Sequence, residues 1–328
     1  MNRKSTVMIL LVVLLILTMF AALSGNGTIP FGAVMKMLFI SGEGAESFIV
    51  RELRLPRVIL AAFCGGALGV AGAVLQSVLR NPLASPDLLG ISAGGGCAGL
   101  AILLWFPALM PFMGVAVLVG SMAVTLLICL AAWKRAFPPL QLILCGVALS
   151  ALFGTFSALM MILASERYAA VFDFLLGGFS SASWYQVKFF VPGAAAAIIA
   201  SLGMAKKLDI LALGEDAAHN LGVRVRPMRL WALTVAALGA ASAAGAAGLL
   251  GFAGLIAPHT VRVLGKSGSN SFIIAASAFA GAELAVLGDW LGQRLTSGIH
   301  ELPAGIFLSG CGALFFMFLL NNSRRGEI

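Results

Sequence analysis

Long apolar segments alternate with short polar ones along almost the whole chain. A helix needs about 20 residues to cross roughly 30 Å of hydrocarbon, and its backbone hydrogen bonds must close within the segment. The pattern predicts ten membrane-spanning helices, at residues 6–23, 58–79, 88–106, 112–133, 140–164, 187–205, 229–249, 251–264, 271–291 and 303–320. The eighth segment is short for a full crossing. We therefore expect one all-α polytopic membrane domain over residues 1–328.

The first apolar segment has a second interpretation as a secretory signal. Arg3 and Lys4 precede it, and Ala22-Leu23-Ser24 resembles a cleavage site. Its apolar run is longer than the core of a usual signal peptide, and further spans follow it. We expect an uncleaved first helix.

Composition excludes a water-soluble enzyme and a disordered chain. Of the 328 residues, 60% are hydrophobic and 10% are charged, whereas a soluble domain has about 25% charged residues. The 39 glycines also suit a membrane bundle, because small residues let helices approach closely.

The net charge of +8 predicts an orientation rather than a nucleic-acid partner, because the basic residues lie mostly in short loops and form no stripe. With ten spans and the N-terminus inside, 14 of the 21 Lys and Arg residues fall on the inner face. The positive-inside rule favours this arrangement. We expect both termini in the cytoplasm, and no nucleic acid as a partner.

Two polar connections are longer than the others. Residues 24–57 form an expected outer loop that ends in three arginines, and residues 206–228 form an expected inner loop. In the inner loop the alternation of apolar and polar residues suggests short helices. The inner loop is either a docking surface or an ordinary connection, and composition alone does not decide between them.

Spaced glycines and prolines suggest an internal repeat. Gly69 and Gly72 precede Pro82 in one half, and Gly251 and Gly254 precede Pro258 in the other. Spans 2–5 and 7–10 would then form two repeats of opposite direction, as in many transporters.

Catalytic chemistry is absent from the pattern. Gly265-Lys266-Ser267 resembles the end of a nucleotide-binding loop, but Thr260 occupies the position where that motif needs glycine. The histidines and cysteines lack metal-ligand spacing. We expect no catalytic residue, no metal site and no cofactor. The acidic residues Asp87, Glu283 and Asp289 in or beside spans are either functional or paired near a helix end.

Several motifs occur in one order between about residues 50 and 320. They are Arg54-Leu55-Pro56-Arg57, Arg80-Asn81-Pro82-Leu83-Ala84, Leu144-Cys145-Gly146-Val147-Ala148-Leu149-Ser150, Gly214-Glu215, Gly251-Phe252-Ala253-Gly254-Leu255-Ile256-Ala257-Pro258-His259 and Glu301-Leu302-Pro303-Ala304-Gly305-Ile306. In these motifs the chain resembles the FecCD-type permeases of ABC importers, which take up iron–siderophore complexes, haem and vitamin B12.

The resemblance implies a non-enzymatic permease subunit in the bacterial inner membrane that moves a ferric siderophore complex. The alternatives are vitamin B12 or haem in the same family, or an ion-coupled secondary carrier, for which the sequence lacks a chain of coupling acids. The implied partners are a dimer of ABC ATPase subunits, an extracytoplasmic substrate-binding protein, a second copy or a paralogous permease, and the lipid bilayer.

The resemblance also implies three groups of functional residues. Those expected to dock the binding protein are Arg54, Arg57 and Arg294, although arginines there could instead anchor helix ends at headgroups. Those expected to seat in the ATPase are Gly214, Glu215, Ala217, Ala218, Leu221 and Gly222. Those expected to line the translocation path are Ser150, Thr155, Ser157, Met160 and Met161, although the methionines could simply fill packing gaps.

Overall fold

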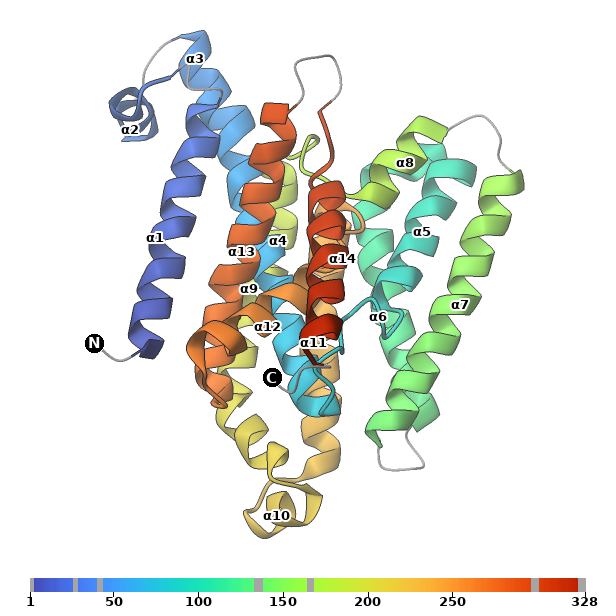
Figure 1. The fold of residues 1–328 in the computed structure, drawn as a ribbon. Helices are drawn as coiled ribbons and strands as arrows, with labels where there is room; N and C mark the ends of the chain where they lie inside the picture. Colours follow the sequence, from blue (N-terminus) through green and yellow to red (C-terminus); the bar gives the residue numbers. More distant parts are fainter. Residues whose placement is uncertain are drawn as a thin grey trace.

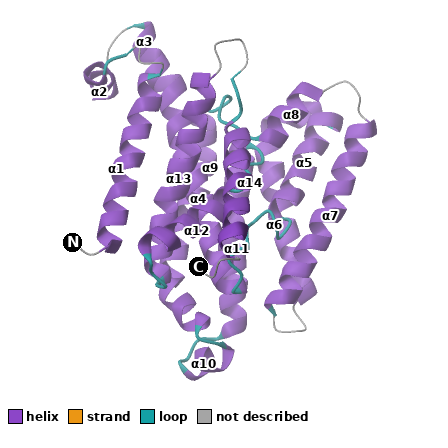
Figure 2. Ribbon diagram, viewed as in Figure 1, coloured by secondary structure: helices purple, strands orange, loops and turns teal. Residues whose placement is uncertain are grey.

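The computed structural model describes residues 3–25, 29–39, 44–132, 138–163, 168–295 and 301–323. Within these ranges every regular element is helical, as Figure 2 shows. The elements in chain order are α1 (Arg3–Ser24), α2 (Phe31–Phe39), α3 (Ala45–Phe48), the π-helix η1 (Ile49–Arg54), α4 (Leu55–Leu79), α5 (Ile91–Trp105), the 3₁₀-helix η2 (Pro107–Phe112), α6 (Met113–Ala132), α7 (Pro139–Leu163), α8 (Tyr168–Leu176), α9 (Trp184–Ala212), α10 (Glu215–Asn220), α11 (Val225–Ala247), α12 (Ala253–Gly265), α13 (Asn270–Leu295) and α14 (Ala304–Ser323).

The long helices run side by side as a bundle (Figure 1). Each of the ten predicted spans overlaps one α-helix, which confirms the all-α polytopic fold; these helices are α1, α4, α5, α6, α7, α9, α11, α12, α13 and α14. Among the described residues, seven helical stretches are long and apolar enough to cross a membrane, and α5 and α14 are shorter apolar helices. The expected short span is α12, with 13 residues. We call the end of the bundle where α3 lies the α3 end, and the opposite one the α10 end.

The centre of the bundle is α4, which packs against α9, α11, α12 and α13. Close approach depends on glycine, because a Cβ at Gly65 would overlap the carbonyl oxygen of Gly281, and a Cβ at Gly72 would overlap that of Gly254. Small residues let helix backbones touch where no hydrophobic driving force between helices exists in lipid. Of the glycines of the suspected repeat, Gly69, Gly72 and Gly254 therefore serve packing.

Two helices begin inside the bundle. Residues 80–90 lead to α5 and residues 248–252 lead to α12; the residues before each helix, Gly90 (φ +74°) and Phe252 (φ +63°), are left-handed. The Asp87 carboxylate accepts hydrogen bonds from Ser92 Oγ and from the Phe252 backbone N–H, and so connects the two starts. Since α4 runs toward the α10 end and α11 runs away from it, the arrangement fits the predicted inverted repeat (Figure 1).

The two long polar connections contain more helix than their composition predicts. Residues 24–57, expected to be a loop, hold α2, α3, η1 and the first turn of α4. In residues 206–228, the first part continues α9 to Ala212, and only α10 is a separate short helix. Hydrogen bonds within each segment let the backbone stay helical beyond the apolar stretch.

Candidate functional site: two polar ends and an exposed helix

An ion-pair cluster lies at the α3 end, between α4, α13 and the residues before α14. Arg57 Nε donates to Asp289 Oδ2 at 2.8 Å, and its Nη2 donates to Asp289 Oδ1 at 2.9 Å. Its Nη1 donates to Glu301 Oε2 at 2.7 Å. The side chains of Arg57 and Asp289 are 14% and 4% exposed, whereas that of Glu301 is 45% exposed. Arg57 is therefore already neutralised within the chain.

The other two arginines predicted to dock a partner are more accessible. Arg54 is half-buried, and its Nη1 donates to the carbonyl oxygen of Leu23 at 3.0 Å, at the C-terminus of α1. A cation at this position suits the negative end of a helix. Arg294 is exposed, with its guanidinium 4.8 Å from the centroid of the Trp290 ring. The structure brings Arg54 and Arg57 together around a cavity of about 450 Å³, which Arg294 does not line.

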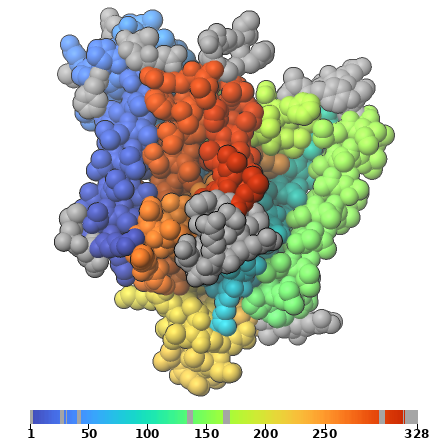
Figure 3. All heavy atoms as spheres, viewed as in Figure 1, coloured from blue at the N-terminus to red at the C-terminus, as the bar shows by residue number. Residues whose placement is uncertain are grey.

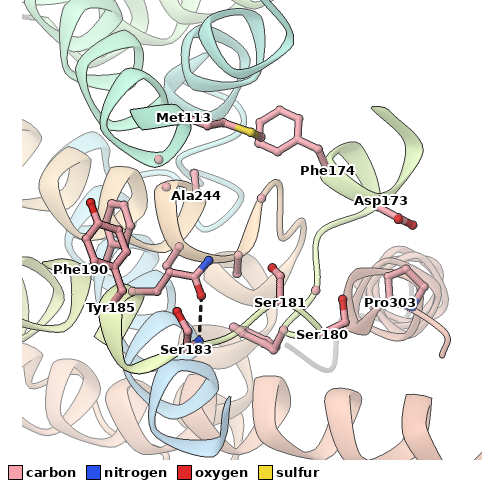
Figure 4. Close-up of a pocket in the computed structure, with 18 of the residues that line it drawn as sticks. Met113, Asp173, Phe174, Ser180, Ser181, Ser183, Tyr185, Phe190, Ala244 and Pro303 are labelled. Atoms are coloured by element: carbon pink, nitrogen blue, oxygen red, sulfur yellow. Dashed lines mark hydrogen bonds between the residues drawn. The ribbon is translucent and has the colours of Figure 1, made fainter. Parts of the chain in front are cut away.

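A larger cavity of about 1270 Å³ opens beside this cluster at the α3 end. Figure 4 looks into it: Met113 and Phe174 lie on one side, and Ser180, Ser181 and Ser183 lie on the other. The backbone N–H of Ser183 donates to Gln186 Oε1 at 3.0 Å, which forms part of the cap of α9. The cavity is therefore bordered by aromatic and hydroxyl groups, with Arg57 and Glu301 at its margin.

The predicted ATPase-contacting residues form a compact turn around α10, which protrudes at the opposite end (Figure 3). Ala218 is fully buried, and its carbonyl oxygen accepts a hydrogen bond from Val223 N–H at 2.8 Å. Glu215 Oε1 accepts from Nη2 of Arg229, a side chain only 1% exposed, at 2.8 Å. Gly214 and Gly222 have φ values of +128° and +80°.

The turn around α10 is thus anchored by the buried Ala218 and by the Glu215–Arg229 pair. Glu215, Leu221 and Gly222 are nevertheless exposed, whereas Gly214 and Ala217 are half-buried. Glycine allows the left-handed turns at both edges of the segment without steric cost. The structure therefore brings all six predicted residues into a single element.

The predicted path residues lie on α7, of which little packs against the rest of the chain. Thr155 is exposed, and its Oγ1 donates to Ala151 O at 2.9 Å. Ser150 and Ser157 are half-buried. Met160 is buried in a hydrophobic cluster with Leu100 and Phe174, and Met161 packs against the same cluster. These contacts favour the packing interpretation of the methionines.

The acidic residues of the spans have polar partners. Asp289 pairs with Arg57, Glu283 Oε2 accepts from Thr18 Oγ1 at 2.8 Å, and Asp87 accepts from Ser92. Among the residues that the structure describes, no group of three or more His, Cys, Asp and Glu side chains could hold a metal ion. In the described chain these acids therefore bind helices to one another.

Sequence reasoning missed the partners of the arginines. Asp289 is an acid within a predicted span and Glu301 is part of a motif, but they lie 232 and 244 positions from Arg57 in the sequence. No local spacing links residues so far apart. The only sequence feature that could have indicated the ion pair was an acid within one span and an arginine at the edge of another.

This architecture defines a multi-pass membrane permease, built of apolar helices with a cluster of polar residues at each end. The model of the FecCD transport family matches residues 11–322, and the chain belongs to that family. It is a transport subunit of the ABC importer type and not an enzyme.

Relatives with known names cover nearly the whole chain. The Fe(3+)-citrate import system permease protein YfmE of Bacillus subtilis (strain 168) is 34% identical over 98% of this chain and 96% of the relative. The achromobactin transport system permease protein CbrC of Dickeya dadantii (strain 3937) is 35% identical over 96% of this chain and 91% of the relative. A solved metal-chelate type ABC transporter in an inward-facing conformation matches with a TM-score of 0.85 and 25% identity, over 97% of this chain and 99% of its own.

Proposed function

We propose that this chain is the permease subunit of an ATP-driven importer for a ferric siderophore or a related ferric chelate. The observation that carries the proposal is the match over almost the full length to permeases named for ferric citrate and achromobactin import. The membrane-spanning bundle supports it, because it supplies a conduit and has no nucleotide-binding loop of its own.

In this proposal the α10 end faces the cytoplasm, where it meets a dimer of ATPase subunits. The turn around α10 protrudes beyond the bundle and is anchored to α11 through the Glu215–Arg229 pair. An anchored, protruding helix can be pushed as a rigid body when the ATPase subunits close. The basic residues next to it, Lys206, Lys207, Arg224 and Arg226, agree with a cytoplasmic location. Both termini would then also be cytoplasmic, in a bacterial inner membrane.

The α3 end would face outward and receive the substrate-binding protein. Arg54 and Arg294 present cations there, and rim charges of this kind set the rate of association and its salt dependence. Arg57 carries a full set of carboxylate partners already. A carboxylate of the binding protein would therefore reach Arg57 by replacing the exposed Glu301.

The exposed face of α7 would line the transport path, next to a second permease chain. Thr155 and the half-buried Ser150 and Ser157 give this helix a weakly polar lining without charge. Such a lining lets a bulky chelate pass without binding it tightly. The other exposed residues of α7 are small residues and large apolar ones, the latter including Leu144, Leu152, Phe156 and Ile162, which suit contact with lipid or with the second chain.

Uptake of radioactive iron tests the cargo. A strain that lacks the gene is given ⁵⁵Fe as ferric citrate, as a ferric hydroxamate and as a ferric catecholate, with and without the restored gene. We expect the restored gene to recover uptake of at least one chelate, and an inactive ATPase subunit to abolish that uptake. If no iron chelate is imported but labelled vitamin B12 or haem is, the cargo assignment is wrong.

A further inference from the structure

Polar contacts near the α10 end connect the last turn of α9 with α13 and α4. Asp209 Oδ1, one turn before the end of α9, accepts from the Asn270 backbone N–H at 2.7 Å and from Asn270 Nδ2 at 2.9 Å. Asn270 Oδ1 in turn accepts from Ser77 Oγ of α4 at 2.5 Å. Nearby, Arg80 donates through Nη2 to the carbonyl oxygen of Leu211. We call Ser77, Asn270 and Asp209 the polar bridge.

The centre of the polar bridge is buried, whereas Ser77 and Asp209 on either side of it are half-buried. Asn270 is 4% exposed, and both its amide nitrogen and its amide oxygen have partners. It is also the first residue of α13, so the Asp209 carboxylate accepts a backbone N–H at the positive end of that helix. Charge-assisted bonds of this kind are shorter and stronger than neutral ones.

Above the bridge, α4 and α13 are in contact along much of their length. A Cβ at Gly65 would overlap Gly281 O, and a Cβ at Gly69 would overlap Ser277 O. At the α3 end the Arg57–Asp289 pair joins the same two helices. Helices in contact at both ends and in the middle move together, because packed interiors transmit displacement rather than absorb it.

The connection to α10 is short. Only residues 213 and 214 separate the end of α9 from α10, and Leu208 and Leu211 of α9 are fully buried. Figure 1 shows α9 continuing below the lower end of α13 to the turn that carries α10. A displacement of α10 therefore reaches Asp209 within about one helical turn.

The geometry points to Asp209 and Asn270 as positioning residues that transmit movement of α10 into the pair α4–α13, and through it to the α3 end. This role rests on the proposed function, in which α10 meets the ATPase subunits and the α3 end faces outward. The alternative is that the polar bridge contributes only to stability.

A reporter at the α3 end tests transmission without any cargo. Leu53, 52% exposed at the end of η1, is replaced by cysteine, and the permease is assembled with its ATPase subunits in liposomes. The rate of labelling by a membrane-impermeant maleimide is measured without nucleotide and after trapping with ATP and vanadate. The same assembly without Leu53→Cys gives the background from the native cysteines.

Exchanging the side chains at positions 209 and 270 separates a role in transmission from a role in folding. Asn270→Asp places two carboxylates in contact, and adding Asp209→Asn restores an amide–carboxylate pair in the opposite sense. Asp209→Ala removes the contact without repulsion. Thr18→Val is the matched control, because it removes the Thr18–Glu283 hydrogen bond between α13 and α1, which has no link to α10. Size-exclusion chromatography gives the amount of folded complex for each variant.

We expect trapping to change the labelling rate of the Leu53→Cys reporter by about fivefold or more, the lower end of usual coupling between distant sites. Asn270→Asp and Asp209→Ala should lose this change, the double variant should regain it, and Thr18→Val should keep it. The proposal is overturned if trapping leaves the labelling rate of the parent unchanged, or if either single variant keeps the full change in labelling rate. It is also overturned if the double variant shows no change on trapping, or if Thr18→Val loses as much of the change as the single variants do. Iron uptake plays no part in this readout, so failure of the cargo assignment is seen separately in the ⁵⁵Fe experiment.

Discussion

Arg57 and Asp289 form a two-bond ion pair, with 2.8 Å between Nε and Oδ2 and 2.9 Å between Nη2 and Oδ1. The pair joins α4 to α13, and both side chains are largely withdrawn from solvent. A fork of two parallel bonds fixes the angle between the two groups as well as their distance. The arginine that the sequence assigns to a partner protein therefore stabilises its own bundle first.

Breaking this pair should destabilise the permease. Asp289→Asn leaves Arg57 with the single, more exposed carboxylate of Glu301. The cost should therefore stay below the about 3–5 kcal/mol of a buried charge left without any partner. We expect a clearly lower midpoint of thermal unfolding in detergent. The apolar pair Arg57→Met with Asp289→Leu should recover most of it. Glu283→Gln, on the same helix but facing Thr18, is the control and should change little; equal losses in both single variants would contradict the prediction.

Neutralising Glu301 should strengthen docking. Glu301→Gln leaves Arg57 Nη1 without its exposed carboxylate, so a carboxylate of the binding protein can take that place. Exposed pairs contribute under about 1 kcal/mol, which predicts roughly two- to fivefold tighter binding. Surface plasmon resonance with the immobilised importer at two salt concentrations measures this. Glu52→Gln removes an exposed charge at the same end; an equal gain from it would show that Arg57 takes no part.

Gly72 should not tolerate even alanine. A Cβ there would overlap Gly254 O, so α4 and α12 would have to separate. We expect Gly72→Ala to reduce the amount of folded permease strongly, as measured by fluorescence-detected size exclusion. Gly203 of α9 also lies within a helix but has nothing within 4 Å of a built Cβ, so Gly203→Ala should fold normally. Equal yields of folded permease for Gly72→Ala and Gly203→Ala would contradict the close contact between α4 and α12.

Gly222 should distinguish backbone strain from contact with the ATPase. Its φ is +80°, yet a Cβ there would meet nothing within 4 Å in this chain. Gly222→Asn should be tolerated, because asparagine visits the left-handed region routinely. Gly222→Trp adds backbone strain at this φ but meets no neighbour in this chain. If α10 contacts the ATPase as proposed, the bulk of the tryptophan should uncouple ATP hydrolysis from transport in the permease that folds. The number of ATP molecules hydrolysed per imported iron measures this, and a normal ratio for the tryptophan variant would contradict the docking proposal.

Thr155 should lie close to its equivalent in a second copy if α7 borders a central path. Thr155→Cys is expected to give a disulfide-linked dimer under mild oxidation in membranes. The unsubstituted chain controls for the native cysteines, and Leu126→Cys on α6, an exposed apolar position, should stay monomeric. A dimer from Leu126→Cys and none from Thr155→Cys would place the second chain against α6 rather than α7 and would contradict the proposed path.

The sequence predicted the helices better than their interactions. Spans such as 58–79 and 187–205 are evident because an apolar run of that length has no other stable state in lipid. The continuation of α9 beyond residue 205 was missed, since Lys206 and Lys207 end the apolar run although the backbone stays helical. The motif around Arg54 and Arg57 predicted the position of a cationic cluster, but not that Arg57 has two carboxylate partners within the chain.

By itself the sequence determined that this chain lies in a membrane, which segments form its apolar helices, and which family it joins. Hydrophobic length is a local property and can be read one segment at a time. Which arginine is already ion-paired, which methionine is packed and which acid accepts a hydrogen bond from the first residue of a neighbouring helix were decided only by the tertiary structure. Those outcomes depend on groups far apart in the sequence, which meet only when glycine-lined helix faces close on each other.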